Sequence, residues 1–308
     1  MDKTDRICVI GSEGLLGHAV VHALEERGYS DIVKIDREDV DLRDQEATAR
    51  LFEREKPAGV FFLAAVAAGI RYKKEHPVEM LLDNLQMVTN VLSSAHAVGV
   101  KKLINICSAL IYPGTAAIPL KEEDAVSVDL NNVDTPYALA KSAGVKLAQY
   151  YRSEFGDAFI SAVPCNFFGE YAPFEGDRAG VVPSLISRIH RAREDHLPQV
   201  EVWGTGNACR ELLNSKDVAS ACVFLMENEV GYDFVNIGRG VEFTIREVAE
   251  TIRRVVGYEG ALFFDADKPE GRLHMQLNVD RLFGMGWRPS MDLEESIRDA
   301  YEWYKSTI

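Results

Sequence analysis

The sequence predicts an α/β protein in which a doubly wound parallel sheet is joined to a smaller C-terminal α/β lobe. Over the first 165 residues, short apolar runs alternate with longer amphipathic stretches, a pattern typical of parallel strands and their crossover helices. A glycine-spaced turn follows the first apolar run, and after about residue 168 the alternation loosens. We therefore expect an N-terminal domain, residues 1–168, and a lobe, residues 169–308, partly interleaved with the main sheet.

Each expected element is indicated by the period of its apolar residues. Strands are expected where apolar residues run continuously, and helices where they recur at helical spacing. The expected strands are 6–10, 31–35, 59–64, 102–107 and 159–164. The expected helices are 15–27, 45–55, 77–98 and 136–155, followed in the lobe by 183–194, 217–227, 245–256 and 293–306.

Composition and charge narrow the classes of function. The 308 residues are 47% hydrophobic and 27% charged, and the formal net charge of −14 argues against a general nucleic-acid role. No run approaches the roughly 20 apolar residues that span a bilayer, and the N-terminus shows no signal-peptide pattern. Five widely spaced cysteines and seven histidines form no ligand pattern. We expect reduced thiols, a cytoplasmic protein that binds no membrane, and no metal.

The turn after the first strand predicts a dinucleotide-binding loop of the Rossmann type. Gly11, Gly14 and Gly17 have the spacing G-x-x-G-x-x-G. Glycine permits a tight turn and close approach of the backbone to a pyrophosphate, and the following helix N-terminus offers free N–H groups. The alternative is a glycine-rich turn that binds nothing. The other cofactor contacts expected from these strand ends are Leu15, Leu16 and Ala64.

The end of the second strand bears on the choice of cofactor. Asp36 lies about 20 residues after the last glycine, where a carboxylate accepts hydrogen bonds from ribose hydroxyls and repels a 2′-phosphate. Arg37 follows it and offsets part of that repulsion. The sequence thus favours NAD(H) and leaves NADP(H) open, with a solvated turn carboxylate as the plainer interpretation of Asp36.

Three further residues form a candidate catalytic set. Tyr137 and Lys141 are spaced Tyr-x-x-x-Lys near the start of a predicted helix, so both side chains share one face. We expect the ammonium to lower the pKa of the phenol and to hold the nicotinamide ribose. Ser108, at the end of the fourth strand, would polarise the reacting carbonyl. Asn84 would complete a proton relay through water.

Specific motifs extend this pattern over nearly the whole chain. They are Tyr112-Pro113, Pro136-Tyr137-Ala138-x-Ala140-Lys141, Pro164-x-Asn166-x-x-Gly169, Val202-Trp203-Gly204-x-Gly206, Arg210-Glu211, Asn236-Ile237-Gly238, Thr244-Ile245-Arg246-Glu247, Lys268-Pro269-Glu270-Gly271 and Leu282 through Gly286-Trp287. With the loop and the catalytic set, the chain resembles extended short-chain dehydrogenase/reductases, in particular the GDP-L-fucose synthase family. That family epimerises C3 and C5 of GDP-4-keto-6-deoxymannose and then reduces C4 with NADPH.

The resemblance implies substrate contacts and a homodimer. Arg210 would pair with a diphosphate oxygen, a surface ion pair being the alternative, and Trp203 would contact the nucleotide-sugar unless it is a core aromatic. Helices 77–98 and 136–155 resemble the pair that builds a four-helix dimer interface, although their apolar stripes would also suit packing on their own sheet. The implied substrate contacts are Ser108, Asn166, Val182, Trp203, Arg210 and Lys268.

Two departures from the resembled family bear on the chemistry. In the synthases a cysteine in Ser-x-Cys-Ile-Tyr-Pro is the epimerisation base, whereas this chain has Leu110 there, which cannot move a proton. Gly180 stands where the family has the partner histidine, before Val-Ile-Pro. Cys107 is no obvious substitute, because neighbours on an extended strand face opposite ways. A further difference is His274-Met275, where the family tends to have basic residues.

We therefore expect an NAD(P)(H)-dependent oxidoreductase acting at C4 of a GDP-linked (6-deoxy)hexose or heptose without C3/C5 epimerisation. The sequence does not set the direction of the reaction. One alternative is a nucleotide-sugar C4 epimerase with retained NAD, and another is a full GDP-L-fucose synthase with substitute acid/base residues. A 4,6-dehydratase is disfavoured, because Ala109-Leu110 offers no acid. The catalytic set disfavours a dinucleotide-sensing protein without turnover.

Overall fold

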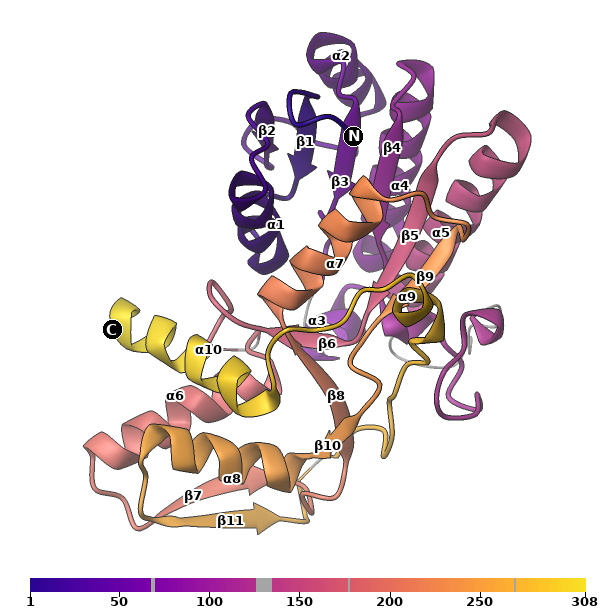
Figure 1. Cartoon of the computed structure of the whole chain (residues 1–308). Coiled ribbons are helices and arrows are strands. Elements are labelled where there is room, and N and C mark those ends of the chain that lie inside the picture. Colours follow the sequence, from indigo (N-terminus) through magenta and orange to yellow (C-terminus); the bar gives the residue numbers. More distant parts are fainter. Residues whose placement is uncertain (68–69, 126–134, 177, 269) are drawn as a thin grey trace.

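A six-stranded parallel sheet forms the centre of the N-terminal half (Figure 1). The computed structural model describes residues 1–67, 70–125, 135–176, 178–268 and 270–308. In spatial order the strands are β2 (Ile32–Ile35), β1 (Ile7–Ile10), β3 (Gly59–Phe62), β4 (Lys102–Ile106), β5 (Phe159–Pro164) and β9 (Phe234–Ile237). Every pairing in this sheet is parallel, which confirms the expected doubly wound fold. The last strand, β9, comes from beyond residue 168.

The sheet is covered by helices on both faces. They are α1 (Leu15–Glu26) and α7 (Ser215–Glu227) on one face, and α2 (Gln45–Glu55), α4 (Pro77–Ala97) and α5 (Thr135–Phe155) on the other. Alternate residues of β1 show why: Ile7 and Val9 pack with α1 and α7, whereas Cys8 and Ile10 pack with α2 and α4. Burial on both faces accounts for the continuous apolar runs in the sequence.

A second hydrophobic core organises the C-terminal lobe, in the lower part of Figure 1. Its helices are α6 (Val181–Glu194), α8 (Ile245–Val256) and α10 (Leu293–Thr307). Its strands are β7 (Gln199–Trp203) and β11 (Ala261–Asp265), which pair in parallel, and β10 (Glu242–Thr244), β8 (Cys209–Asn214) and β6 (Asn166–Phe168), which form a three-stranded sheet in that order. Short helices complete the described part of the chain: α3 (Ile70–Glu75), α9 (Asp280–Gly284) and 3-10 turns at Ala109–Ile111 and Glu122–Asp124. Of the described helices, none is long and apolar enough to cross a membrane.

The helices that border the cavities begin differently from those that do not. Thr244 and Asp292 start capping boxes at the heads of α8 and α10, so their side chains satisfy backbone N–H groups there. By contrast, α1 and α6 begin at Gly14 and Gly180, which provide no side-chain cap. Both glycines lie in the walls of cavities, so the free N–H groups of α1 and α6 are available to a ligand.

Candidate active site

Two adjoining cavities lie along the carboxyl ends of the parallel strands. The larger, of about 1100 Å³, lies beside the ends of β1, β2 and β3. The smaller, of about 660 Å³, lies between the ends of β4 and β5 and the C-terminal lobe. Gly11, Gly14 and Leu63 belong to the walls of both, so they form one continuous cleft. Open α/β sheets bind their ligands at this edge.

The glycine loop has the geometry of a dinucleotide cradle. Gly11 has φ +91°, and a Cβ there would lie 2.9 Å from the backbone nitrogen of Ala64. A Cβ at Gly17 would lie 2.1 Å from the carbonyl oxygen of Gly11. No larger side chain fits either position, because the loop lies close to the end of β3 and to the start of α1. These glycines, with Leu15 and Leu16, line the cleft, as expected for a loop that receives a pyrophosphate.

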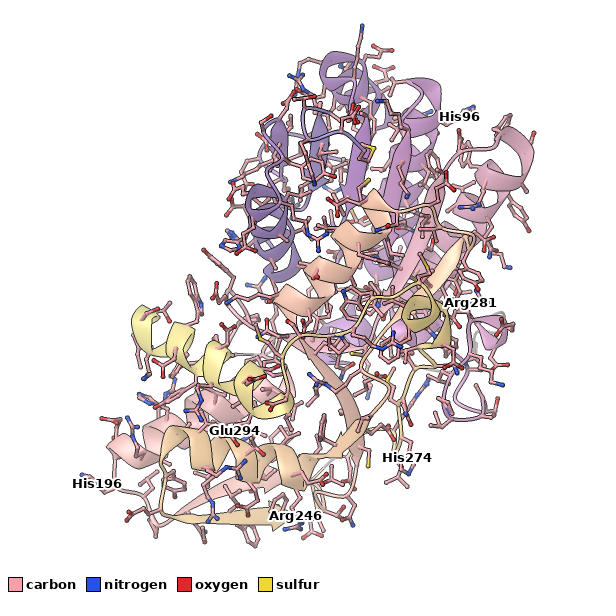
Figure 2. All side chains as sticks on the ribbon, in the orientation of Figure 1. His96, His196, Arg246, His274, Arg281 and Glu294 are labelled. Atoms are coloured by element: carbon pink, nitrogen blue, oxygen red, sulfur yellow. The ribbon has the colours of Figure 1, made fainter. Side chains whose placement is uncertain are left out.

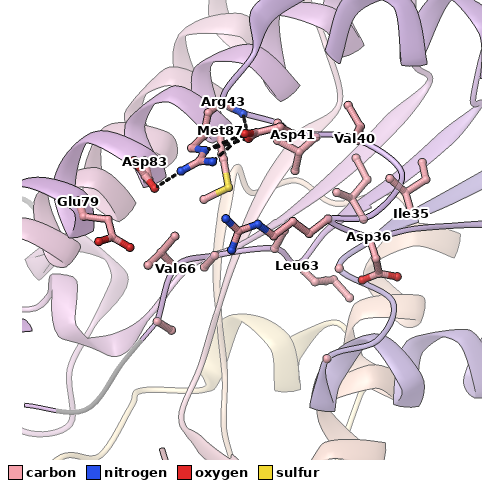
Figure 3. A pocket seen from close by; sticks show the side chains of 18 of the residues that line it. Ile35, Asp36, Val40, Asp41, Arg43, Leu63, Val66, Glu79, Asp83 and Met87 are labelled. Atoms are coloured by element: carbon pink, nitrogen blue, oxygen red, sulfur yellow. Dashed lines mark hydrogen bonds and ion pairs between the residues drawn. The ribbon is translucent and has the colours of Figure 1, made fainter. Parts of the chain in front are cut away.

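Asp36 points back to the glycine loop from the end of β2 (Figure 3). One of its carboxylate oxygens accepts a hydrogen bond from the backbone N–H of Glu13 at 3.1 Å, and the other accepts from the hydroxyl of buried Ser12. The carboxylate is therefore fixed in the wall of the larger cavity, where the ribose of a dinucleotide is expected. Arg37 and Ala64 line the same cavity.

The larger cavity is rich in carboxylates that hold an arginine (Figure 3). The guanidinium of Arg43 donates to Asp41 at 2.7 Å and to Asp83 at 2.8 Å. The hydrogen bonds from Arg43 lower the pKa of Asp41 to about 2. Because both partners are carboxylates, the charge of Arg43 is compensated within the protein. Glu75 and Glu79 also line this cavity.

The three predicted catalytic side chains come together in the smaller cavity. Tyr137 and Lys141 lie on α5 and are 9% and 8% exposed, and Ser108 follows β4. The ammonium of Lys141 lies 5.8 Å from the centroid of the Tyr137 ring and donates to the carbonyl oxygen of Ile106 at 2.9 Å. The hydroxyl of Ser108 accepts from the backbone N–H of Leu110 at 3.3 Å, and its own proton is left to donate.

The electrostatics of the phenol differ from the sequence-based expectation. Burial, followed by the nearby Cys107, raises the pKa of Tyr137 above its ordinary value, and burial lowers the pKa of Lys141. The prediction that Lys141 lowers the phenol pKa is therefore wrong for this structure, because desolvation dominates. A phenol with a raised pKa is protonated throughout the neutral range, so it is prepared to act as a proton donor.

Asn84 has a structural position in place of the expected relay. Its side-chain oxygen accepts from the N–H of Val66 at 3.0 Å, and its nitrogen donates to the carbonyls of Val66 and Met80 at 3.0 and 2.7 Å. It is buried and belongs to the wall of neither cavity. The proton-relay hypothesis is not supported, because the amide holds the segment after β3 against α4.

The expected substrate contacts divide into two groups. Asn166, Val182 and Arg210 line the smaller cavity together with Ser108. Trp203 does not, because buried and exposed residues alternate along β7 and its side chain faces outward, 56% exposed. Lys268, which is exposed in the loop after β11, also lies outside the cavity wall. Neither residue is supported as a substrate contact.

Other wall residues were not found from the sequence. Arg272 and Met275 line the smaller cavity from the segment before α9, and Arg272 donates to the carbonyl oxygen of Tyr112 at 3.3 Å. Arg210 approaches the same segment, since its guanidinium donates to the carbonyl oxygen of Arg272 at 2.6 Å. The two guanidinium groups therefore belong to one side of the cavity. Arg210 was expected here from its motif, whereas Arg272 lies 62 residues further along the chain and its only sequence signal is its basic character.

The smaller cavity contains few groups that could exchange a proton with a sugar carbon. Leu110 and Gly180 both line it, and neither residue has a side chain that can transfer a proton. Among the described residues of this wall there is no aspartate, glutamate or histidine. The remaining groups that can exchange a proton near neutral pH or above it are Tyr137, Lys141 and two buried thiols, Cys107 and Cys165.

A chain that brings a dinucleotide loop, a buried phenol and a buried ammonium to the same strand ends is built as a nicotinamide-dependent oxidoreductase. Within that class, a narrower family can be assigned to the chain. The model of the NAD dependent epimerase/dehydratase family matches residues 7–238, and the chain belongs to that family.

Individual relatives cover the whole length of the chain. GDP-L-fucose synthase 1 of Arabidopsis thaliana is 38% identical over 307 residues, covering 100% of this chain and 95% of the relative. Among solved structures, a GDP-6-OMe-4-keto-L-xylo-heptose reductase from C. jejuni has a TM-score of 0.92 at 28% identity, covering 100% of this chain and 99% of that one. A GDP-mannoheptose C4 reductase from Campylobacter jejuni with NADP bound has a TM-score of 0.90 at 29% identity, covering 99% of each chain.

Proposed function

We propose that this protein uses a nicotinamide dinucleotide to reduce or oxidise C4 of a GDP-linked sugar, without epimerising C3 or C5. The observation that carries the proposal is the smaller cavity, which holds Ser108, Tyr137 and Lys141 and, in its described wall, no carboxylate or imidazole. The likeness to both GDP-L-fucose synthases and GDP-heptose C4 reductases supports this class of substrate.

The chain's own residues supply binding, polarisation and a proton. When bound, the reduced dinucleotide supplies the hydride that C4 receives. Ser108 donates a hydrogen bond to the carbonyl oxygen, and Tyr137 gives that oxygen its proton, so that the ketone becomes an alcohol. Lys141 holds the ribose next to the nicotinamide and stabilises the phenolate that remains. In the oxidative direction the same phenolate removes the proton of the C4 hydroxyl.

Epimerisation at C3 or C5 needs a base to remove a carbon-bound proton and an acid to return it. Leu110 and Gly180 provide neither. Burial raises the pKa of Cys107 to about 11 and that of Cys165 well above its ordinary value, so neither thiol is readily ionised near neutral pH. These features disfavour the alternative of a full synthase with substitute residues.

The walls of the larger cavity support a preference for NAD(H). Asp36 is held at the ribose position, and Asp41 and Asp83 compensate the charge of Arg43, so a 2′-phosphate would meet carboxylates as well as Arg37. A C4 epimerase that retains NAD is the second candidate, because Asp36 favours NAD and such a reaction requires only the proton acceptor and donor Tyr137.

The proposal is tested by identifying cofactor and substrate together. Purified protein is denatured and any released dinucleotide is identified, and GDP-4-keto sugars and GDP-hexoses are then supplied while the absorbance of reduced nicotinamide is followed. Net change in that absorbance with a GDP-sugar supports the oxidoreductase. Interconversion of C4 epimers without net change supports the epimerase, and no reaction with any GDP-sugar contradicts both.

We also propose a homodimer located in the cytoplasm. Exposed apolar side chains follow the outer sides of α4 and α5, among them Val78, Leu82 and Tyr150, which suits the expected four-helix interface. All five cysteines are free, as a reducing compartment favours. Light scattering should give twice the chain mass, and Leu82→Glu should shift it to the mass of one chain.

A further inference from the structure

Three metal-ligating side chains that the proposed function does not use lie together at the edge of the C-terminal lobe. Cys209 begins β8, Glu242 begins β10, and His274 belongs to segment 271–276, which runs beside these strands (Figure 2). One ligand atom from each lies within 4.8 Å of the other two. The sequence predicts no metal because 33 and 32 residues separate these positions, so no local spacing reveals them.

Sheet pairing brings the first two residues together. β8 and β10 are antiparallel, with Cys209 opposite Thr244 and Glu242 opposite Glu211. Cys209 and Glu242 are thus diagonal neighbours on one face, a relation in which long side chains meet.

Segment 271–276 is fastened over this pair by three hydrogen bonds. The N–H of Cys209 donates to the carbonyl oxygen of Leu273 at 2.7 Å, and the N–H of Met275 donates to the carboxylate of Glu242 at 2.5 Å. The side chain of Gln276 donates to the carbonyl oxygen of Gly240 at 2.6 Å. His274 is therefore held next to the other two ligands.

The donor set is that of zinc. Thiolate, imidazole and carboxylate all bind Zn²⁺, whereas Ca²⁺ and Mg²⁺ take oxygen ligands. The Nδ1 atom of His274 lies 2.9 Å from one carboxylate oxygen of Glu242. Ligands at about 2.0 and 2.1 Å from a tetrahedral zinc ion are roughly 3.4 Å apart, so the pair would separate by about 0.5 Å. His274 can move this far, because its side chain is 52% exposed.

The second carboxylate oxygen of Glu242 accepts a hydrogen bond of the kind that orients the carboxylate ligands of metal ions. It accepts the N–H of Met275, so the carboxylate is oriented while its other oxygen faces His274. Such outer contacts orient ligands in known metal sites. Three protein ligands leave the fourth position of a tetrahedral ion to water.

We propose that Cys209, Glu242 and His274 form a Zn²⁺ site that pins segment 271–276 beside the substrate cavity. Binding replaces the thiol proton of Cys209 with a zinc–sulfur bond and releases that proton to solvent, so affinity rises with pH. The pinned segment contains Arg272 and Met275, which line the cavity, and Arg210 follows Cys209 directly. The site thus fastens two walls of the substrate pocket to each other.

The arrangement does not suit an activated cysteine nucleophile. Burial, followed by Glu242 and Glu247, raises the pKa of the Cys209 thiol, whereas a reactive thiol needs a lowered one.

The test uses full-length protein treated with a chelator and dialysed. Zn²⁺ is titrated against a chromophoric chelator, and Co²⁺ is added separately to record the absorption band of a cobalt–thiolate bond. One equivalent of Zn²⁺ should bind, thermal unfolding should shift upward with zinc, and the cobalt band should appear. Cys209→Ser and His274→Ala should each weaken zinc binding about tenfold or more, and Cys209→Ser should abolish the band.

His22→Ala is the matched control, because His22 is an exposed histidine on α1, far from these ligands in the sequence, and its loss should change neither zinc binding nor the cobalt band. Dinucleotide binding by each variant shows that it has folded. Zinc binding by the wild type no tighter than that of Cys209→Ser/His274→Ala, or a cobalt complex without the thiolate band, would overturn the proposal. These measurements need no turnover, so they are independent of the proposed reaction.

Discussion

The described walls of the larger cavity contain five carboxylates, and those of the smaller cavity contain none. Both cavities lie at the carboxyl ends of one sheet, so the topology alone does not produce the difference. At the larger cavity the hydrogen bonds from Arg43 lower the pKa of Asp41, which favours its charged form. At the smaller cavity the phenol and the ammonium are buried, and burial shifts the pKa of each toward its neutral form.

The contrast indicates that cofactor recognition and proton transfer take place in different parts of one cleft. In the proposed function, the carboxylates of the larger cavity discriminate between dinucleotides by the ribose substituent and lie away from the sugar. Tyr137 in the smaller cavity is then the principal proton donor, so proton transfer is confined to one oxygen.

The largest effect is expected from removing the phenol of Tyr137 from the smaller cavity. Tyr137→Phe should lower kcat by about 10²–10⁴-fold, because a positioned proton donor is lost. The Kd for dinucleotide, measured by fluorescence titration, should change little. Tyr150→Phe, an exposed tyrosine on the same helix, is the control and should keep full activity. Unchanged turnover in Tyr137→Phe would remove the phenol from the mechanism.

The raised pKa of Tyr137 predicts opposite pH profiles for the two directions. Reduction needs the protonated phenol, which persists below a raised pKa, so kcat for reduction should be flat from pH 6 to 8. Oxidation needs the phenolate, whose fraction rises about tenfold per pH unit below the pKa, so its rate should rise roughly 100-fold over the same range. An oxidation rate that levels off below pH 7 would show that the phenol pKa is lowered during turnover.

Asp36, in the wall of the larger cavity, should affect the preference between NADH and NADPH. Asp36→Asn keeps an oxygen to accept the N–H of Glu13 but removes the charge, so the ratio of kcat/KM for NADPH to that for NADH should rise about tenfold. Glu38→Gln, on the same turn, is the control because Glu38 is exposed and lies outside the cavity wall. An unchanged ratio in Asp36→Asn would mean that Arg37 and Arg43 decide the preference.

The smallest effect is expected at Arg272, which was not predicted from the sequence. Arg272→Ala should raise KM for the GDP-sugar by several-fold up to about tenfold, through loss of one charge-assisted contact to the diphosphate, while kcat stays within about twofold. Arg298→Ala, on the surface of α10, is the control. An unchanged KM would show that Arg210 alone meets the diphosphate.

The sequence predicted the parts of the molecule that local patterns determine. The first five strands of the main sheet and its covering helices follow from apolar period, whereas the sixth strand, β9, was not predicted. Gly11, Gly17, Tyr137 and Lys141 follow from spacing within one loop or one helix. Features set by tertiary context were not predicted: Trp203 faces solvent because it lies on the outer face of β7, and Arg272 reaches the cavity only through the fold. The pKa of Tyr137 depends on burial, which no spacing reveals.

In the proposed reaction, no group of the smaller cavity exchanges a proton at C3 or C5 of the sugar while C4 is reduced. The most direct test is turnover of a GDP-4-keto sugar in deuterium oxide with unlabelled reduced dinucleotide, followed by NMR of the product. We predict protium at C3, C4 and C5. Enzyme-dependent deuterium at C3 or C5 would contradict the account, because it would show that Lys141, a buried thiol or another group of the described wall removes a carbon-bound proton.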